Sequence, residues 1–185
     1  MIKFILITIF LLNSTFADEF HVDKDKKNMV KFISDAPIED FEGVTSNIDG
    51  YLIGNPSNIK EDSELYFEVQ LNTLETGIGL RDRHMRENYL HTDKYPLTHF
   101  TGKIIEAKNT PEGWDVKVSG EMFVHGVKKK QTIKGEMIKT SKGYRVKSSF
   151  IVALTDHKIE VPSLMFQKID ENMQLELDFY LMKVD

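Results

Sequence analysis

Apolar and polar residues alternate along most of the chain after residue 18. In the clearest segment, residues 64–71, one face carries only apolar side chains: Leu65, Phe67, Val69 and Leu71. A two-residue period of this kind predicts a β-strand with one buried face. The same pattern covers 114–122, 144–154 and 174–181, and weaker versions cover 28–34, 39–54, 97–107 and 130–140. The chain is therefore expected to form about eight strands.

Turn-forming residues join several of these segments. Asn109–Gly113, His125-Gly126 and Ser141–Gly143 are short connections rich in asparagine, glycine, serine and proline. Short connections favour antiparallel neighbours. The period itself leaves two architectures open: a sandwich with a solid core, or a closed barrel whose interior is only partly filled. An eight-stranded barrel either fills with side chains or holds one small ligand.

Two segments break the alternation. Residues 77–95 are rich in helix formers, and the spacing of Ile78, Met85 and Tyr89 predicts one short helix from about Leu80 to Leu90. The second segment, 156–172, is a long connection that contains Leu164, Met165 and Phe166 in a row. Long connections in compact domains are usually functional, so we expect this one to act as a lid.

The N-terminus has the order of a secretory signal peptide. Lys3 precedes an apolar run from Phe4 to Leu12, and a small-residue close ends at Ala17. The run is too short to span a bilayer, which takes about 20 residues. We expect residues 1–17 to be removed on export and residues 18–185 to form one domain, with no second segment of membrane-spanning length.

Composition narrows the function classes. The chain has 185 residues, a net charge of −5 and no cysteine, so disulfides, zinc–cysteine sites and thiol chemistry are excluded. An acidic protein is a poor candidate for nucleic-acid binding, which needs clustered positive charge. The common catalytic and nucleotide-binding motifs are also missing.

The remaining polar candidates have ordinary structural interpretations. His84 and His91 are seven residues apart and could bind a metal, but exposed histidines are the favoured interpretation. Arg81 and His84, in the charge cluster 81–87, could hold a polar head group, although helix-stabilising ion pairs are favoured. Lys128–Lys130 is interpreted as a solvated turn, and a transient membrane-surface contact stays open.

Three blocks of sequence resemble the YceI-like family of polyisoprenoid-binding proteins. The first is Thr76-Gly77 with Arg81-Asp82-Arg83-His84, followed by Lys94-Tyr95-Pro96 and Phe100. The second is Val118–Lys129, and the third is Leu154–Ile159. The chain departs from the family pattern at His125, where a small polar residue is usual, and at His157-Lys158, where an aromatic–glycine pair is usual.

The resemblance implies an all-β fold with one short helix, an eight-stranded antiparallel lipocalin-like barrel. It also implies a long isoprenoid or fatty-acyl ligand in the lumen, export to the periplasm and no established enzymatic activity. Relatives dimerise, so a homodimer stays open. We accordingly expect a periplasmic lipid-binding protein, not an enzyme, without cofactor or metal, that transports, stores or sequesters its ligand.

The expected ligand contacts are the inward strand residues, two polar residues near one mouth and one residue on the lid. They are Phe67, Val69, Trp114, Val116, Phe150, Val152, Leu177 and Phe179, then Arg81 and His84, then Phe166. Two alternatives stay open: an enzyme or stress factor acting on an isoprenoid or quinone head group, with His84 as acid–base and Asp82 as its partner, and an exported module that binds another protein through the lid.

Overall fold

A computed structural model describes residues 17–34, 40–161, 163–164, 167–168 and 170–184. The predicted signal peptide therefore lies almost wholly outside the described residues, and so does Phe166. The strands are β1 (Asp18–Val22), β2 (Met29–Ser34), β3 (Phe41–Thr45), β4 (Ile48–Gly54), β5 (Glu64–Gln70), β6 (Leu97–Thr110), β7 (Gly113–Val124), β8 (Val127–Lys139), β9 (Gly143–Ala153), β10 (Ser163–Leu164), β11 (Gln167–Lys168) and β12 (Asn172–Lys183). The helical elements are η1 (Leu71–Thr73), α1 (Gly79–His84), η2 (Met85–Tyr89) and η3 (Thr155–His157).

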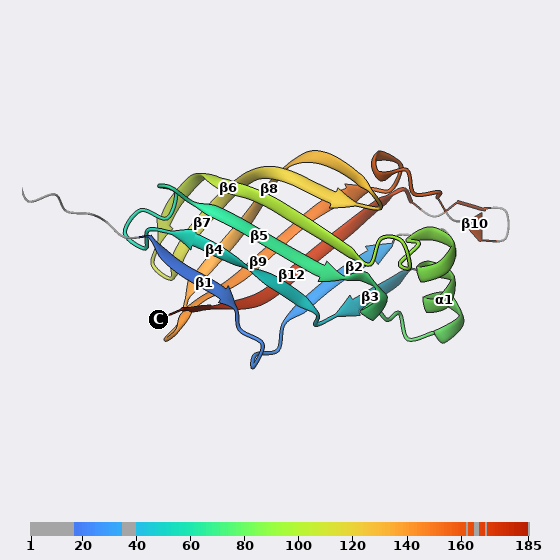
Figure 1. The fold of residues 1–185 in the computed structure, drawn as a ribbon, viewed down its shortest axis with the longest axis horizontal. Helices are drawn as coiled ribbons and strands as arrows, with labels where there is room; N and C mark the ends of the chain where they lie inside the picture. The colour runs from blue at the N-terminus through green and yellow to red at the C-terminus, as the bar shows by residue number, and fades with distance from the viewer. Residues whose placement is uncertain (1–16, 35–39, 162, 165–166, 169, 185) are drawn as a thin grey trace, which may run out of the picture.

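The main sheet closes on itself. Its order is β1-β4-β5-β6-β7-β8-β9-β12, and β12 pairs back onto β1 through Phe20 opposite Lys183 and Val22 opposite Leu181. All neighbours are antiparallel, and β2 and β3 continue from β12 as two further strands. The predicted eight-stranded antiparallel barrel with one short helix is therefore confirmed (Figure 1).

The structure corrects several element boundaries. The strand β1 was not expected, because its five residues show only Phe20 and Val22 as an apolar pair. The segment 39–54 is two strands, separated at Ser46-Asn47, where the chain leaves β2 and begins to pair with β1. The helix expected from about Leu80 to Leu90 is divided in two. The α-helix α1 ends at His84, and the π-helical turn η2 continues it to Tyr89.

The barrel has two unlike ends. One end carries the β6–β7 and β8–β9 turns, the connection from β4 to β5 and the C-terminus; we call it the hairpin end. The opposite end carries α1, η2, the β7–β8 turn, η3 and the β2–β3 pair; we call it the helix end (Figure 1). Every long strand runs from one end to the other, so each contributes inward side chains to both.

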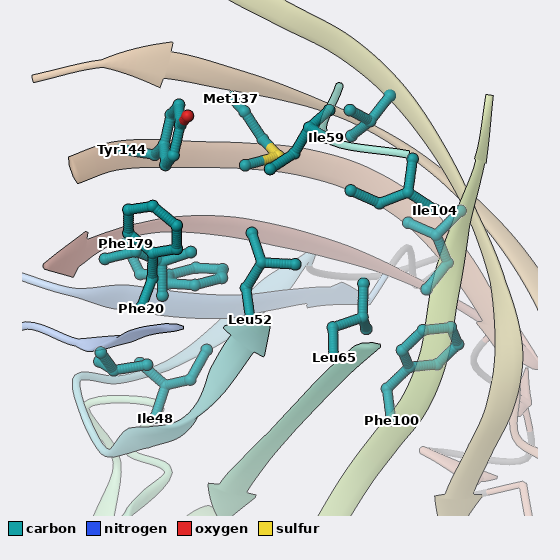
Figure 2. Close-up of a cluster of buried hydrophobic side chains, with 14 of the residues drawn as sticks. Phe20, Ile48, Leu52, Ile59, Leu65, Phe100, Ile104, Met137, Tyr144 and Phe179 are labelled. Carbon is teal, nitrogen blue, oxygen red and sulfur yellow. The ribbon is translucent and has the colours of Figure 1, made fainter. Parts of the chain in front are cut away.

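A continuous apolar cluster runs through the barrel, from Leu52 and Leu181 near the hairpin end to Phe100 near the helix end (Figure 2). Ile59, from the β4–β5 connection, is fully buried, and Leu52 and Leu181 are each 2% exposed. The Phe20 and Tyr144 rings meet edge to face with centroids 5.1 Å apart. Close packing of this kind leaves little free volume, so the hairpin end is a solid core.

Candidate functional site: the barrel interior

The eight strand residues expected to line the lumen all lie on the inward face. Trp114, Val116, Val152 and Phe179 are buried, whereas Phe67, Val69, Phe150 and Leu177 are partly buried against the main cluster. Phe67 and Phe179 meet edge to face across the interior at 5.0 Å. Their inward orientation follows the predicted alternation; contact with a ligand stays a prediction.

The helix end holds both buried and partly buried apolar side chains, and Phe100, Met122 and Val152 are among the buried ones. A separate cluster forms there around Met173, which is buried, with the partly buried Phe32, Phe41, Leu154 and Val161 packed against it. In the main cluster, the partly buried members include Val69, Val124 and Phe150, all toward the same end. Partly buried apolar side chains on the inside of a barrel mark surface that a further apolar group could cover.

A hollow of about 920 Å³ lies against the barrel wall at mid-length. It spans β6, β7, β8, β9 and β12, each contributing three successive residues. The inward residue of three of these triplets is small: Ala107, Gly135 or Ser148. The charged residues on either side also line the hollow, so it is open to solvent. Val116 and Leu177 belong to the same row.

A hydrogen-bonded clamp holds the start of α1 against the barrel. The buried Asp82 carboxylate accepts hydrogen bonds from the backbone N–H and the hydroxyl of Thr76. Arg81 donates from Nε to the Thr76 hydroxyl at 2.9 Å and from Nη2 to the Thr76 carbonyl at 3.1 Å. Its guanidinium also lies 4.7 Å from the centre of the Phe41 ring. Arg81 is thus placed at the helix end, where it is already engaged, whereas His84 is exposed to solvent.

Tyr95 and Gly126 join the helix segment to the β7–β8 turn. A Cβ atom at Gly126 would lie 2.7 Å from the Tyr95 ring, and its φ of 77° is also one that glycine favours. The Tyr95 ring packs edge to face on His125, with centroids 4.8 Å apart. Only glycine lets the ring approach this closely, so the position of Tyr95 requires glycine at position 126.

His157 is the buried histidine of the helix end. It is 2% exposed, and its Nδ1 atom lies 3.2 Å from the Val127 carbonyl oxygen. Burial lowers the pKa of His157, because the imidazolium form loses its solvation there. The described residues contain no group of three or more histidine, cysteine, aspartate or glutamate side chains placed to hold a metal ion. Nor does any helix among them have the length and apolarity to cross a membrane.

Comparison with known proteins identifies the family of this chain. The sequence model of the YceI-like domain matches residues 20–181, which is nearly the whole described barrel. The chain belongs to the YceI-like family. A search of curated proteins gives no match.

Solved YceI-like and related structures share the fold at low sequence identity. BcnA of Burkholderia cenocepacia is 12% identical with a TM-score of 0.74, over 85% of this chain and 98% of its own. A polyisoprenoid-binding domain of Saccharophagus degradans, implicated in plant cell wall breakdown, is 14% identical with a TM-score of 0.65, over 91% and 99%. The YceI protein of Campylobacter jejuni is 17% identical with a TM-score of 0.61, over 77% and 84%.

The two departures from the YceI-like pattern lie together in space. Lys158 stands where glycine is usual and has a φ of 57°, in the left-handed region that glycine favours. His157 stands where an aromatic residue is usual and is buried as that residue would be. The Nδ1 atom of His125 lies 3.2 Å from the His157 carbonyl oxygen. Both departures therefore belong to one contact at the helix end.

Sequence patterns did not reveal two features of this YceI-like site. The role of Thr76 as the centre of the clamp depends on a hydrogen bond across six residues to Asp82. The contact between His91 and His125 joins residues 34 apart in the chain. For the second feature, the only sequence signal was His125-Gly126. This dipeptide predicts a turn, but it does not predict that His91 contacts the turn.

Proposed function

We propose that this protein binds one long apolar chain, an isoprenoid or fatty-acyl lipid, inside the barrel, with entry from the helix end. The observation that carries the proposal is the partly buried apolar surface on the inward face. Ile59 is fully buried at the hairpin end, whereas Val69 and Phe150 toward the helix end, and Leu177 at mid-length, are only partly buried. Polyisoprenoid binding by the Saccharophagus degradans domain supports the same ligand class.

Burial of apolar surface drives the proposed binding. Each Å² of apolar area removed from water contributes about 25 cal/mol, so a chain of several isoprene units gains many kcal/mol before costs. Ordering the chain and immobilising the ligand offset a large part of that gain. Arg81 and His84, at the same end as the entry, are the proposed contacts for a polar head group.

The proposed biological role is carriage, storage or sequestration of that lipid after export. The support for export is the order of residues 1–17, a basic residue, an apolar run and a small-residue close. On this proposal the protein acts in the periplasm and needs no cofactor, because burial alone holds the ligand. A transient contact with a membrane surface would give the lipid a route into the barrel.

A head-group enzyme is the alternative, and the local geometry favours binding over it. Acid–base catalysis by His84 would need a partner, and Asp82 is the nearest carboxylate in sequence. The Asp82 carboxylate is buried and accepts its hydrogen bonds from Thr76. His84 is exposed on the same short helix. The pair that the enzyme hypothesis requires is therefore not formed.

Two neighbouring residues on β9 test the binding site. Phe150 points into the barrel and is partly buried, whereas Ile151 points outward and is 58% exposed. We expect Phe150→Gln to weaken the uptake of a long-chain quinone or fatty acid at least tenfold, because the amide would have to be desolvated against the chain. The matched control, Ile151→Gln, should bind as the unsubstituted protein does.

The ligand itself is tested by native mass spectrometry of protein purified from its own host, followed by solvent extraction. We expect a stoichiometric apolar adduct of several hundred daltons. Protein that is empty and that also takes up neither added quinone nor added fatty acid would rule the proposal out. Equal losses of uptake in Phe150→Gln and Ile151→Gln would remove the barrel interior as the site.

A further inference from the structure

Three histidines form a chain of contacts across the helix end. The Nδ1 atom of His91 lies 2.8 Å from Nε2 of His125, and the two rings are stacked with centroids 5.1 Å apart. The other nitrogen of His125, Nδ1, lies 3.2 Å from the carbonyl oxygen of His157. The contacts join the loop after η2, the β7–β8 turn and η3. These three segments are far apart in the sequence, so the histidine contacts are long-range tertiary contacts.

The chain of contacts fixes where the protons are. A carbonyl oxygen only accepts, so Nδ1 of His125 carries a hydrogen and donates it to His157. In a neutral ring the second nitrogen is then an acceptor, so Nε2 of His125 accepts from Nδ1–H of His91. The neutral pair is therefore fully matched, with one donor and one acceptor at the contact between the two rings.

Two added protons have different consequences for the pair. The first can be taken by Nε2 of His91, and the bond from His91 to His125 is kept. For the second, only Nε2 of His125 is left, which is the atom that accepts the bond. Once it is protonated, two N–H groups and two positive rings face each other across 2.8 Å. A doubly protonated pair therefore has no acceptor left at this contact.

Other groups lie beside the pair. The Tyr95 ring packs edge to face on His125, and Lys129 forms an ion pair with Asp156 at 3.2 Å beside the turn. His157 is itself buried, and burial lowers the pKa of its imidazole. The other charged residues on the three joined segments are Asp93 and Lys94 after η2, Lys128 and Lys130 on β8, and Lys158 and Glu160 after η3.

The backbone at both rings is held in an uncommon conformation. His91 and His125 have φ values of 44° and 50°, in the left-handed region that few non-glycine residues adopt. The carbonyl of His91 also accepts hydrogen bonds from the backbone N–H of Lys94 and Tyr95, at 2.9 and 2.8 Å. The pair is thus an anchored contact between two turns, and its loss would release the loop that carries the helix segment.

We propose that the His91–His125 pair is a proton-sensitive latch, which fastens the helix segment to the β7–β8 turn at neutral pH and releases it when the pair becomes doubly protonated. The latch lies at the helix end, where Val69, Val124 and Phe150 are only partly buried. Its consequence for a bound lipid, easier entry or exit in acid, rests on the proposed function; the latch itself does not.

The latch is tested on the ligand-free protein by amide hydrogen exchange between pH 7.5 and pH 5, corrected for the intrinsic pH dependence of exchange. Opening of residues 85–95 should rise about tenfold for each pH unit below the second protonation step of the pair. In His125→Asn this rise should disappear, because asparagine tolerates a positive φ and does not titrate. The matched control His21→Asn removes a histidine bonded only to Glu19 on β1 and should keep the rise.

A second variant guards against misfolding of the first. His91→Asn should likewise remove the rise, and ring NMR titration of the unsubstituted protein should show two separated steps for the pair where either variant shows one. The latch would be overturned if amide exchange of residues 85–95 in the unsubstituted protein were as independent of pH as in the two variants. A rise that survives in both variants would also overturn it. Neither result involves a lipid, so the latch can fail while the proposed function stands.

Discussion

Leu177 and Leu181 lie on the same strand, β12, and both point into the barrel, yet their surroundings differ. Leu181, at the hairpin end, is 2% exposed, whereas Leu177, four residues earlier at mid-length, is only partly buried. The same contrast separates Leu52 and Ile59 from Phe150 and Val69. The fully buried positions contribute to stability, and we propose that the partly buried ones offer apolar surface to a ligand.

The two leucines provide the largest test of this contrast. Leu181→Ala should lower the free energy of unfolding by about 2–5 kcal/mol, because it opens a cavity in a closed core. Leu177→Ala should cost only about 1–2 kcal/mol, because its side chain is less completely buried. Urea denaturation of both variants measures the difference. Equal costs would mean that the two ends are equally well packed.

The clamp at α1 is the next test, since it holds the looser end in place. Asp82→Asn replaces the buried carboxylate that accepts the hydrogen bonds of Thr76 and should cost about 1–3 kcal/mol. The loss should be local, with faster amide exchange in 77–95 and unchanged exchange at the hairpin end. Glu87→Gln, an exposed carboxylate of the same helical segment, is the control and should change little. A uniform loss of protection along the barrel would argue against a local clamp.

Acid should weaken the helix end through His157. Burial lowers the pKa of this imidazole in the folded protein below its unfolded value of about 6.5. The unfolded chain then binds the proton first, so stability is constant above that pH and falls as the pH drops through 6.5 toward the folded pKa. In His157→Phe, the urea midpoint of unfolding should depend less on pH in this range. An unchanged pH profile in that variant would show that His157 does not contribute.

Surface ion pairs should give the smallest effect, and the same one at both ends. Lys129–Asp156 at the helix end and Lys183–Asp18 at the hairpin end have N–O distances of 3.2 and 2.8 Å. Asp156→Asn and Asp18→Asn should each change the free energy of unfolding by less than about 1 kcal/mol. A clearly larger effect at one end would mean that charge, and not apolar filling, distinguishes the ends.

How far the sequence predicts this molecule depends on the range of each interaction. Alternation identified β5, β7, β9 and β12 and the inward direction of Phe67 or Phe150, because each strand carries its own period. It missed β1, whose register is set by β4 and β12, far away in the chain. It also could not show which inward residues are closed off by Ile59, since that depends on a connection folding back into the barrel.

The polar site was harder to predict for the same reason. The residues of the clamp were visible as a motif, but the bonds from Thr76 to Asp82 follow from the backbone path at Gly77, which has a φ of 81°. The pairing of His91 with His125 requires the barrel to close before the two turns can meet. Local periodicity carries no information about either contact.

In the proposed complex, an apolar chain lies in the barrel with its tail toward the hairpin end. Trp114, the single tryptophan of the chain, is buried beside the β6–β7 turn and reports on that end by its fluorescence. A nitroxide-labelled fatty acid should quench Trp114 more strongly with the label near its methyl end than near its carboxyl end. In the double substitution Trp114→Phe and Phe150→Trp the order should reverse. Absence of quenching by either fatty acid, or the same order in both proteins, would contradict the claim.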